Sequence, residues 1–84
     1  MDKSRINRVV VKEFDRLAYL TPLEMDVLTT RAAGKSQIWQ SQNLHVSQAT
    51  ITRVVRRLQQ KYDAVKGYSA TLPDDLVTSY LTTN

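Results

Sequence analysis

Cysteine is absent from this chain of 84 residues, which excludes disulfide bonds and thiolate metal sites. The two glycines, Gly34 and Gly67, stand alone, so no glycine-rich loop is present to hold a phosphate group. The one histidine, His45, has no partner at the spacing of metal ligands. The sequence therefore predicts a protein that is not an enzyme, with no catalytic residue, metal, cofactor or small-molecule ligand.

Long apolar runs are absent as well. No stretch approaches the ~20 residues that cross a membrane, and no apolar signal-peptide core follows the first residues. We therefore expect a soluble, cytoplasmic protein without a membrane partner. Residues 1–84 are expected to form one domain, because the chain is close to the shortest length that folds on one core and shows no linker or repeat. Such short chains without a covalent staple often dimerise.

Acidic residues are scarce in the middle of the chain. Residues 1–34 carry six Lys/Arg against five Asp/Glu, residues 35–67 carry six against one, and residues 68–84 carry two acids alone. The three segments thus have charges of +1, +5 and −2, within a net charge of +4. Positive charge gathered on one segment attracts phosphate over long distances. The alternative is a solvated helix surface that is basic without binding anything.

The spacing of the apolar residues predicts an all-α fold, a small helix-turn-helix bundle of about five helices. Apolar residues recur at steps of three and four from residue 4 to residue 20, with Ser4 as the expected N-cap. Residues 21–24, Thr-Pro-Leu-Glu, are typical of a helix that starts with a capping box. Residues 68–72 are expected to be extended, and Pro73 to open a last helix.

The stretch from Gln37 to Arg57 has the spacing of a helix-turn-helix. A short helix ends at about Asn43, and in the turn after it His45 is expected to adopt a positive φ. Ser47 then caps a second helix, which is expected to run from Gln48 to about Tyr62. The expected inner stripe of this second helix consists of Ile51, Val54, Val55, Leu58 and Tyr62.

The first of these two helices has an irregular apolar pattern. Gln40, a polar residue, occupies the position that is usually buried against the second helix. Two arrangements are open: the helix rotates to bury Ile38, or Gln40 lies at the edge and Trp39 packs instead. We expect Trp39 to be a core or subunit-contact residue and not a base-stacking one. Ser41, a small residue, is expected where the helices cross.

The outer face of the second helix suits the major groove of DNA, because small and polar groups lead and arginines come after them. Gln48 or Arg53 could pair with a base through two hydrogen bonds, and the methyl group of Ala49 could touch thymine. Thr50 is expected to be partly buried, and Arg57 and Lys61 to contact phosphate. Gln37, at a helix N-terminus, is placed for a phosphate contact as well. The predicted DNA-binding residues are Gln37, Ser47, Gln48, Ala49, Thr50, Thr52, Arg53, Arg56 and Arg57.

Two sets of short motifs resemble known families. The first comprises Leu20-Thr-Pro-Leu-Glu-Met-Asp-Val-Leu28, Ala33-Gly34-Lys35-Ser36, Leu44-His-Val-Ser47 and Thr50-Ile51. It resembles the LuxR/GerE type of four-helix DNA-binding domain. The chain departs from that family at Trp39, Gln40 and Ser41, where an acidic residue, an apolar residue and alanine are usual.

The second set comprises Val27-Leu28, Gly34-Lys35-Ser36-Gln37, Leu44-His-Val-Ser47, Ile51 and Val55-Arg56-Arg57, then Gly67-Tyr68 and Leu72-Pro73-Asp74. It resembles the TrfB/KorA-like group of plasmid-borne repressors, which we favour because the match includes the tail. The resemblance implies a dimeric bacterial transcriptional repressor, encoded on a plasmid or mobile element, that binds a palindromic operator. Its implied contact positions are Ser47, Gln48, Ala49, Thr52, Arg53 and Arg56.

Residues 68–84 form the expected dimerisation tail of a homodimer on double-stranded DNA. The predicted dimerisation residues are Leu72, Leu76, Val77, Tyr80 and Leu81. Two alternatives to a repressor stay open from the sequence. One is a transcriptional activator that uses the same DNA-binding helix, and the other is an adaptor whose basic helix docks an acidic protein partner.

Overall fold

The computed structural model describes the backbone of residues 3–73 and the side chains of residues 9–73. This part of the chain is all-α, which confirms the predicted fold class. Its elements are α1 (Lys3–Ala18), α2 (Pro22–Ala32), α3 (Gln37–Leu44), α4 (Gln48–Val65) and a 3₁₀ turn at Lys66–Tyr68. The helix predicted to begin at Pro73 lies outside the described residues.

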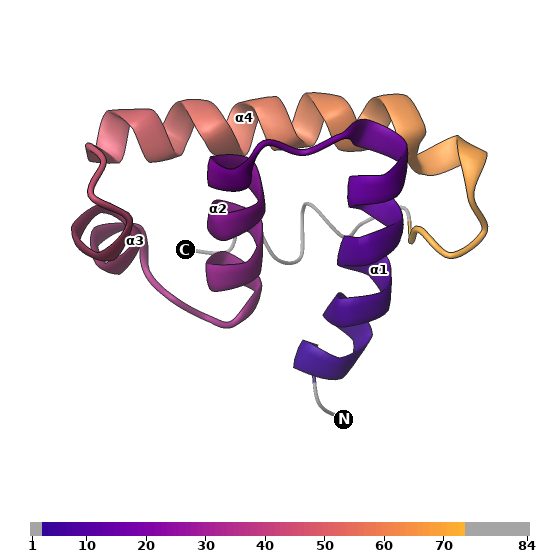
Figure 1. Cartoon of the computed structure of the whole chain (residues 1–84), viewed down its shortest axis with the longest axis horizontal. Helices are drawn as coiled ribbons and strands as arrows, with labels where there is room; N and C mark the ends of the chain where they lie inside the picture. Colours follow the sequence, from indigo (N-terminus) through magenta and orange to yellow (C-terminus); the bar gives the residue numbers. More distant parts are fainter. Residues whose placement is uncertain (1–2, 74–84) are drawn as a thin grey trace.

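The longest helix, α4, extends along one edge of the molecule, with α1 and α2 beneath it and α3 near its N-terminal end (Figure 1). It packs against each of the other three helices. At 1.5 Å per residue, its 18 residues span about 27 Å. One side of α4 therefore rests on the rest of the protein, and the opposite side faces outward along its whole length.

The core lies where α1, α2 and α4 meet. Phe14 and Tyr62 are completely buried there and contact each other edge to face, with ring centroids 5.1 Å apart and planes at 89°. The inner stripe predicted for α4 is largely confirmed, since only Val55 among its five members is less than fully buried. The buried apolar residues are Val10, Val11, Phe14, Val27, Leu28, Ile51, Val54, Leu58, Tyr62 and Leu72.

The ends of the helices follow local side-chain chemistry. The capping box at the start of α2 is confirmed, since Thr21 Oγ1 accepts from the Glu24 N–H at 3.2 Å and the Thr21 N–H donates to Glu24 Oε1 at 2.9 Å. Gly34 comes after α2 with a φ of 91°, which an L-residue with a side chain rarely adopts. The predicted N-cap at Ser4 is wrong, because α1 already includes Lys3.

The segment 68–72, predicted to be extended, is not a strand. Tyr68 ends the 3₁₀ turn, Ser69 has extended backbone angles, φ −147° and ψ 130°, and residues 70–72 form a turn and a bend. The chain then turns, and the Leu72 N–H donates to the Ser69 carbonyl at 3.3 Å. Because Leu72 must enter the core, this segment folds back on the helices and does not continue outward.

Candidate nucleic-acid interface

The predicted turn between α3 and α4 is present, and its details are confirmed. His45 comes directly after α3 in the left-handed conformation, φ 60° and ψ 42°. The Ser41 hydroxyl donates to the Val46 carbonyl at 2.5 Å, so this small side chain closes the turn. Ser47 Oγ accepts from the Thr50 N–H at 3.1 Å and caps α4. The two helices are therefore joined by a short turn that is held by two side chains, Ser41 and Ser47, and by the left-handed backbone of His45.

Both arrangements expected for α3 are wrong, because Gln40 is completely buried while Ile38 is 56% exposed. Gln40 Oε1 accepts from Arg31 Nε at 3.2 Å and from Arg31 Nη2 at 3.1 Å. Its Nε2 donates to the Val27 carbonyl and to Thr30 Oγ1, each at 2.9 Å. A polar side chain can replace an apolar one here because both ends of its amide are hydrogen-bonded. Burial also lowers the pKa of the Arg31 guanidinium.

Trp39 lies near the surface and is not among the residues packed in the core. The Lys35 ammonium lies 5.0 Å from the centroid of its ring, within the range of a cation–π contact. Its backbone carbonyl accepts from Asn43 Nδ2 at 2.8 Å, and its N–H donates to the α3 N-cap, Ser36, at 3.0 Å. Of the two roles expected for Trp39, the role in the core is therefore wrong, and the role as a subunit contact stays a prediction.

Gln37 connects three helices. Arg31 Nη2 donates to Gln37 Oε1 at 3.1 Å. A guanidinium only donates, so this contact fixes which end of the amide is oxygen. The Gln37 Nε2 then donates to the Gln48 carbonyl at 3.1 Å and to Thr52 Oγ1 at 3.0 Å. The side chain predicted to contact phosphate is thus engaged inside the protein, where it holds the first turns of α4.

The outer face of α4 presents most of the predicted DNA-binding residues to solvent. Those exposed are Ser47, Gln48, Ala49, Thr52, Arg53, Arg56 and Arg57. Thr50 is half-buried, as expected. Arg53 and Arg56 make no ion pair within residues 9–73. The sequence has no acidic residue between Asp26 and Asp63, so the charged residues that α4 contributes to this face, up to Arg57, are all positive.

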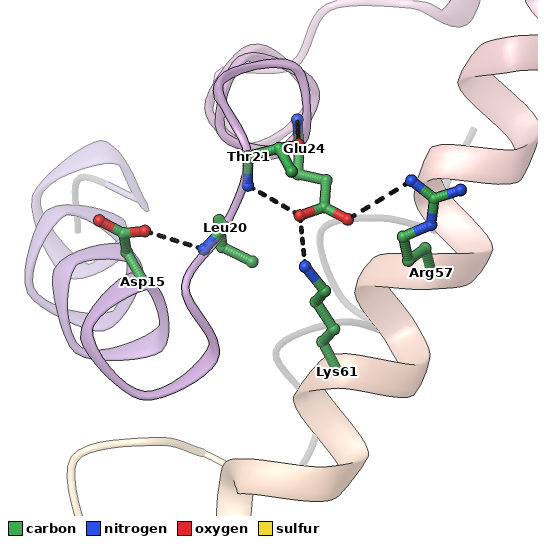
Figure 2. A network of polar contacts seen from close by, with 6 residues as sticks. All are labelled: Asp15, Leu20, Thr21, Glu24, Arg57 and Lys61. Carbon is green, nitrogen blue, oxygen red and sulfur yellow. Dashed lines mark hydrogen bonds and ion pairs between the residues drawn. The ribbon is translucent and has the colours of Figure 1, made fainter.

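The trailing half of α4 is engaged by a buried carboxylate (Figure 2). Glu24 is 1% exposed, and Lys61 Nζ donates to its Oε1 at 2.6 Å. Arg57 Nη1 lies 3.9 Å from its Oε2. Burial disfavours the charged carboxylate, but hydrogen bonds from Lys61 and Thr21 outweigh this effect and lower the pKa of Glu24. The sequence predicts that Lys61 contacts phosphate, but in the structure Lys61 already has an acidic partner, Glu24.

Leu72, the first predicted dimerisation residue, is 5% exposed and packs in the core of its own chain. Tyr62 donates a hydrogen bond to the Pro73 carbonyl, and Ser69 donates to Glu13 Oε2 at 2.6 Å. These contacts join the segment after α4 to the helices of the same chain. The other predicted dimerisation residues, Leu76, Val77, Tyr80 and Leu81, lie outside the described residues.

Two further kinds of site are missing from the part of the chain that the structure describes. None of its helices has the length and apolarity needed to cross a membrane. Within the same residues, no three His, Cys, Asp or Glu side chains come together as they would around a metal ion.

Comparisons with models of protein families, with curated proteins and with solved structures found no match. The resemblances to the TrfB/KorA-like and LuxR/GerE-type families therefore rest on the sequence motifs alone. The geometry of the α3–α4 unit and its positive charge are the physical basis for a function.

Proposed function

We propose that this protein is a sequence-specific transcriptional repressor that binds double-stranded DNA as a homodimer. The observation that carries the proposal is the leading end of α4. It is exposed, begins with small and uncharged hydrogen-bonding groups, and continues into two arginines, Arg53 and Arg56, that have no ion pair among the described residues. A helix of this kind suits insertion into the major groove, since its tip approaches base edges and its cations reach the backbone.

The individual contacts follow from the chemistry of each side chain. Gln48 suits adenine and Arg53 suits guanine, because each can make two parallel hydrogen bonds with that base, worth roughly 1–3 kcal/mol of discrimination. Ala49 lets the helix approach closely and offers its methyl group to thymine. Arg56 contacts phosphate, and Thr52, held by Gln37, lies between these groups on the same face.

The helices beneath α4 give this surface a fixed orientation. Gln37 and Gln40 connect the start of α4 and the whole of α3 to the buried Arg31. A contact surface that is already ordered loses little conformational entropy on binding. We therefore assign Gln37 a positioning role in addition to any contact of its backbone with phosphate.

Two copies would place two α4 helices in successive major grooves of a palindrome, with half-sites ~34 Å apart. Bound at a promoter, such a dimer would block polymerase. The TrfB/KorA-like resemblance implies three further properties: a location in the bacterial cytoplasm, an origin on a plasmid or mobile element, and dimerisation through residues 68–84. We do not include Leu72 among the proposed dimer contacts, because its side chain is buried in the core of its own chain.

The direct test compares Arg53→Ala with a matched control, Lys12→Ala. Both remove one exposed positive charge, but Lys12 lies on α1. Fluorescence anisotropy with a duplex selected from random DNA should show a loss of roughly 5- to 150-fold for Arg53→Ala, the equivalent of one base contact. The control should lose far less, and circular dichroism should show both variants folded. Equal losses in the two variants would contradict the proposal.

A further inference from the structure

Glu24 is the one buried carboxylate in contact with the outer face of α4 among the described residues (Figure 2). Its Oε1 accepts from Lys61 Nζ at 2.6 Å and from the Thr21 N–H at 2.9 Å. Its Oε2 has no hydrogen-bond partner among the described residues, and Arg57 Nη1 lies 3.9 Å away. A buried anion is stable only while opposite charge stays close. The buried carboxylate therefore favours the positions that Lys61 and Arg57 occupy beside it.

The cations of α4 therefore fall into two groups along one helix. Arg53 and Arg56, towards the leading end, have no acidic partner within residues 9–73. Arg57 and Lys61, towards the trailing end, share Glu24. The groups differ in what phosphate binding would require. Arg53 gives up a long hydrogen bond to Thr50 Oγ1, at 3.4 Å, and neither Arg53 nor Arg56 gives up an acidic partner among the described residues. Lys61, in contrast, would have to leave a buried carboxylate with less compensation than it has now.

We infer that Glu24 is an internal counter-ion that keeps Lys61 and Arg57 from binding DNA phosphate, and so confines phosphate contacts to the leading end of α4. This inference rests on the proposed function and specifies which part of the basic helix is available to DNA. Each phosphate contact adds affinity for any sequence. By limiting their number, Glu24 lets the base contacts of Gln48 and Arg53 account for a larger share of the binding free energy.

Glu24→Gln is the sharpest variant, because it removes the charge and keeps the shape. The glutamine oxygen can still accept from the Thr21 N–H, since a capping box forms with Gln as well as with Glu. Release of one cation to DNA adds about 0.9 to the slope of log affinity against log salt. The fall in affinity for random-sequence duplex between 50 mM and 200 mM salt should then be about 3.5-fold larger than in the native protein if one cation is released, and about 12-fold larger if both Lys61 and Arg57 are released. A folded Glu24→Gln protein with the native slope would contradict the inference.

A pair of adjacent exposed residues gives a second test that leaves the buried carboxylate itself unchanged. Arg56→Gln should reduce the salt dependence by about one phosphate contact. Arg57→Gln should leave it almost unchanged in the native protein, although the Arg57 side chain is 57% exposed. In the Glu24→Gln background, however, Arg57→Gln should reduce the salt dependence of DNA affinity as much as Arg56→Gln does. The reason is that no carboxylate at residue 24 then holds the Arg57 guanidinium.

The outcomes separate the two proposals. Equal losses from Arg56→Gln and Arg57→Gln in the native protein would overturn the role of Glu24, even if Glu24→Gln failed to fold, and would leave DNA binding standing. Absence of any binding to duplex DNA by the native protein, at low salt as well as high, would instead overturn the proposed function, and the role of Glu24 with it.

Discussion

The two ends of α4 are attached to the protein by different chemistry. The trailing half rests on an apolar interface, in which Leu58 and Tyr62 are completely buried and Tyr62 meets Phe14. The leading half also buries Ile51 and Val54, but it is joined to α2 and α3 in addition through hydrogen bonds of Gln37, which Arg31 orients. Apolar burial stabilises without direction, whereas hydrogen bonds require a particular geometry. Apolar burial therefore holds both halves of α4 on the core, and the hydrogen bonds at the leading half set the orientation of the proposed contact surface.

The largest expected effect tests the apolar end. Leu58→Ala should lower the free energy of unfolding by about 2–5 kcal/mol, because it removes buried methyl groups and leaves a cavity in the core. Urea denaturation followed by circular dichroism measures this loss. Val55→Ala, at a position of the same helix that is only half-buried, is the control and should cost less. Similar losses at both positions would contradict the view that complete burial of Leu58 in the core sets the size of the loss.

The polar end is tested by Gln40→Ala, which should cost about 3 kcal/mol because it removes four hydrogen bonds of a buried amide, two from Arg31 and one each to Val27 and Thr30. The double variant Arg31→Met with Gln40→Met should recover at least half of that loss, since apolar side chains of similar size replace a buried polar pair. Its sequence selectivity should nevertheless fall, because Gln37 loses the guanidinium that orients it. A double variant as unstable as Gln40→Ala would contradict the view that unpaired buried polar groups cause the loss.

A smaller effect is expected at the cap of α4. Ser47→Ala should cost about 1 kcal/mol, because the Thr50 N–H loses its acceptor. Ser47→Asp keeps the cap and should keep the stability, but it places a negative charge at the end that meets DNA. Thermal unfolding and anisotropy together distinguish the two variants: the first should lose stability, and the second should lose DNA affinity. Loss of neither quantity in Ser47→Asp would argue against DNA contact at this end.

The smallest effect concerns pH. Arg16 and Ser69 hold the pKa of Glu13 at about 2, below the ordinary value of 4.5. Because the folded pKa is the lower one, this contribution to stability is fully present above pH 4.5 and disappears as the pH falls towards 2. Glu13→Gln should therefore show a smaller difference in urea midpoint between pH 5 and pH 3 than the native protein. An unchanged difference would mean that Glu24, whose pKa is also lowered, dominates the acid response.

The features that can be predicted from sequence are those fixed by neighbours in the chain. The caps at Thr21 and Ser47 and the left-handed turn at His45 depend on residues only a few positions apart, and the structure confirms all three. The outer face of α4 results from the helical period, and its predicted exposure is confirmed as well. Local chemistry and periodicity thus account for the helices and for the location of the candidate interface.

The features that sequence reasoning misses depend on partners from different helices. The sequence places Gln40 away from the core because it is polar at a position that is usually apolar, whereas in the fold Arg31, nine positions earlier, donates hydrogen bonds to it. It assigns Lys61 to phosphate because Glu24 lies 37 positions away. One signal in the sequence could have revealed the contact of Gln40: a glutamine stands at a helix position that is usually apolar and buried. It indicates a buried hydrogen-bond partner, but it does not say which residue provides it.

The central claim, that α4 binds DNA with sequence specificity, is tested most directly by selecting bound sites from a pool of random duplex DNA. We expect enrichment of a palindrome with half-sites about one helical turn apart, and loss of that enrichment in Arg53→Ala. Selection should be run at a salt concentration that suppresses attraction of a basic surface to any duplex. A pool in which no sequence is enriched would contradict the claim, because the exposed face of α4 would then be basic without reading DNA.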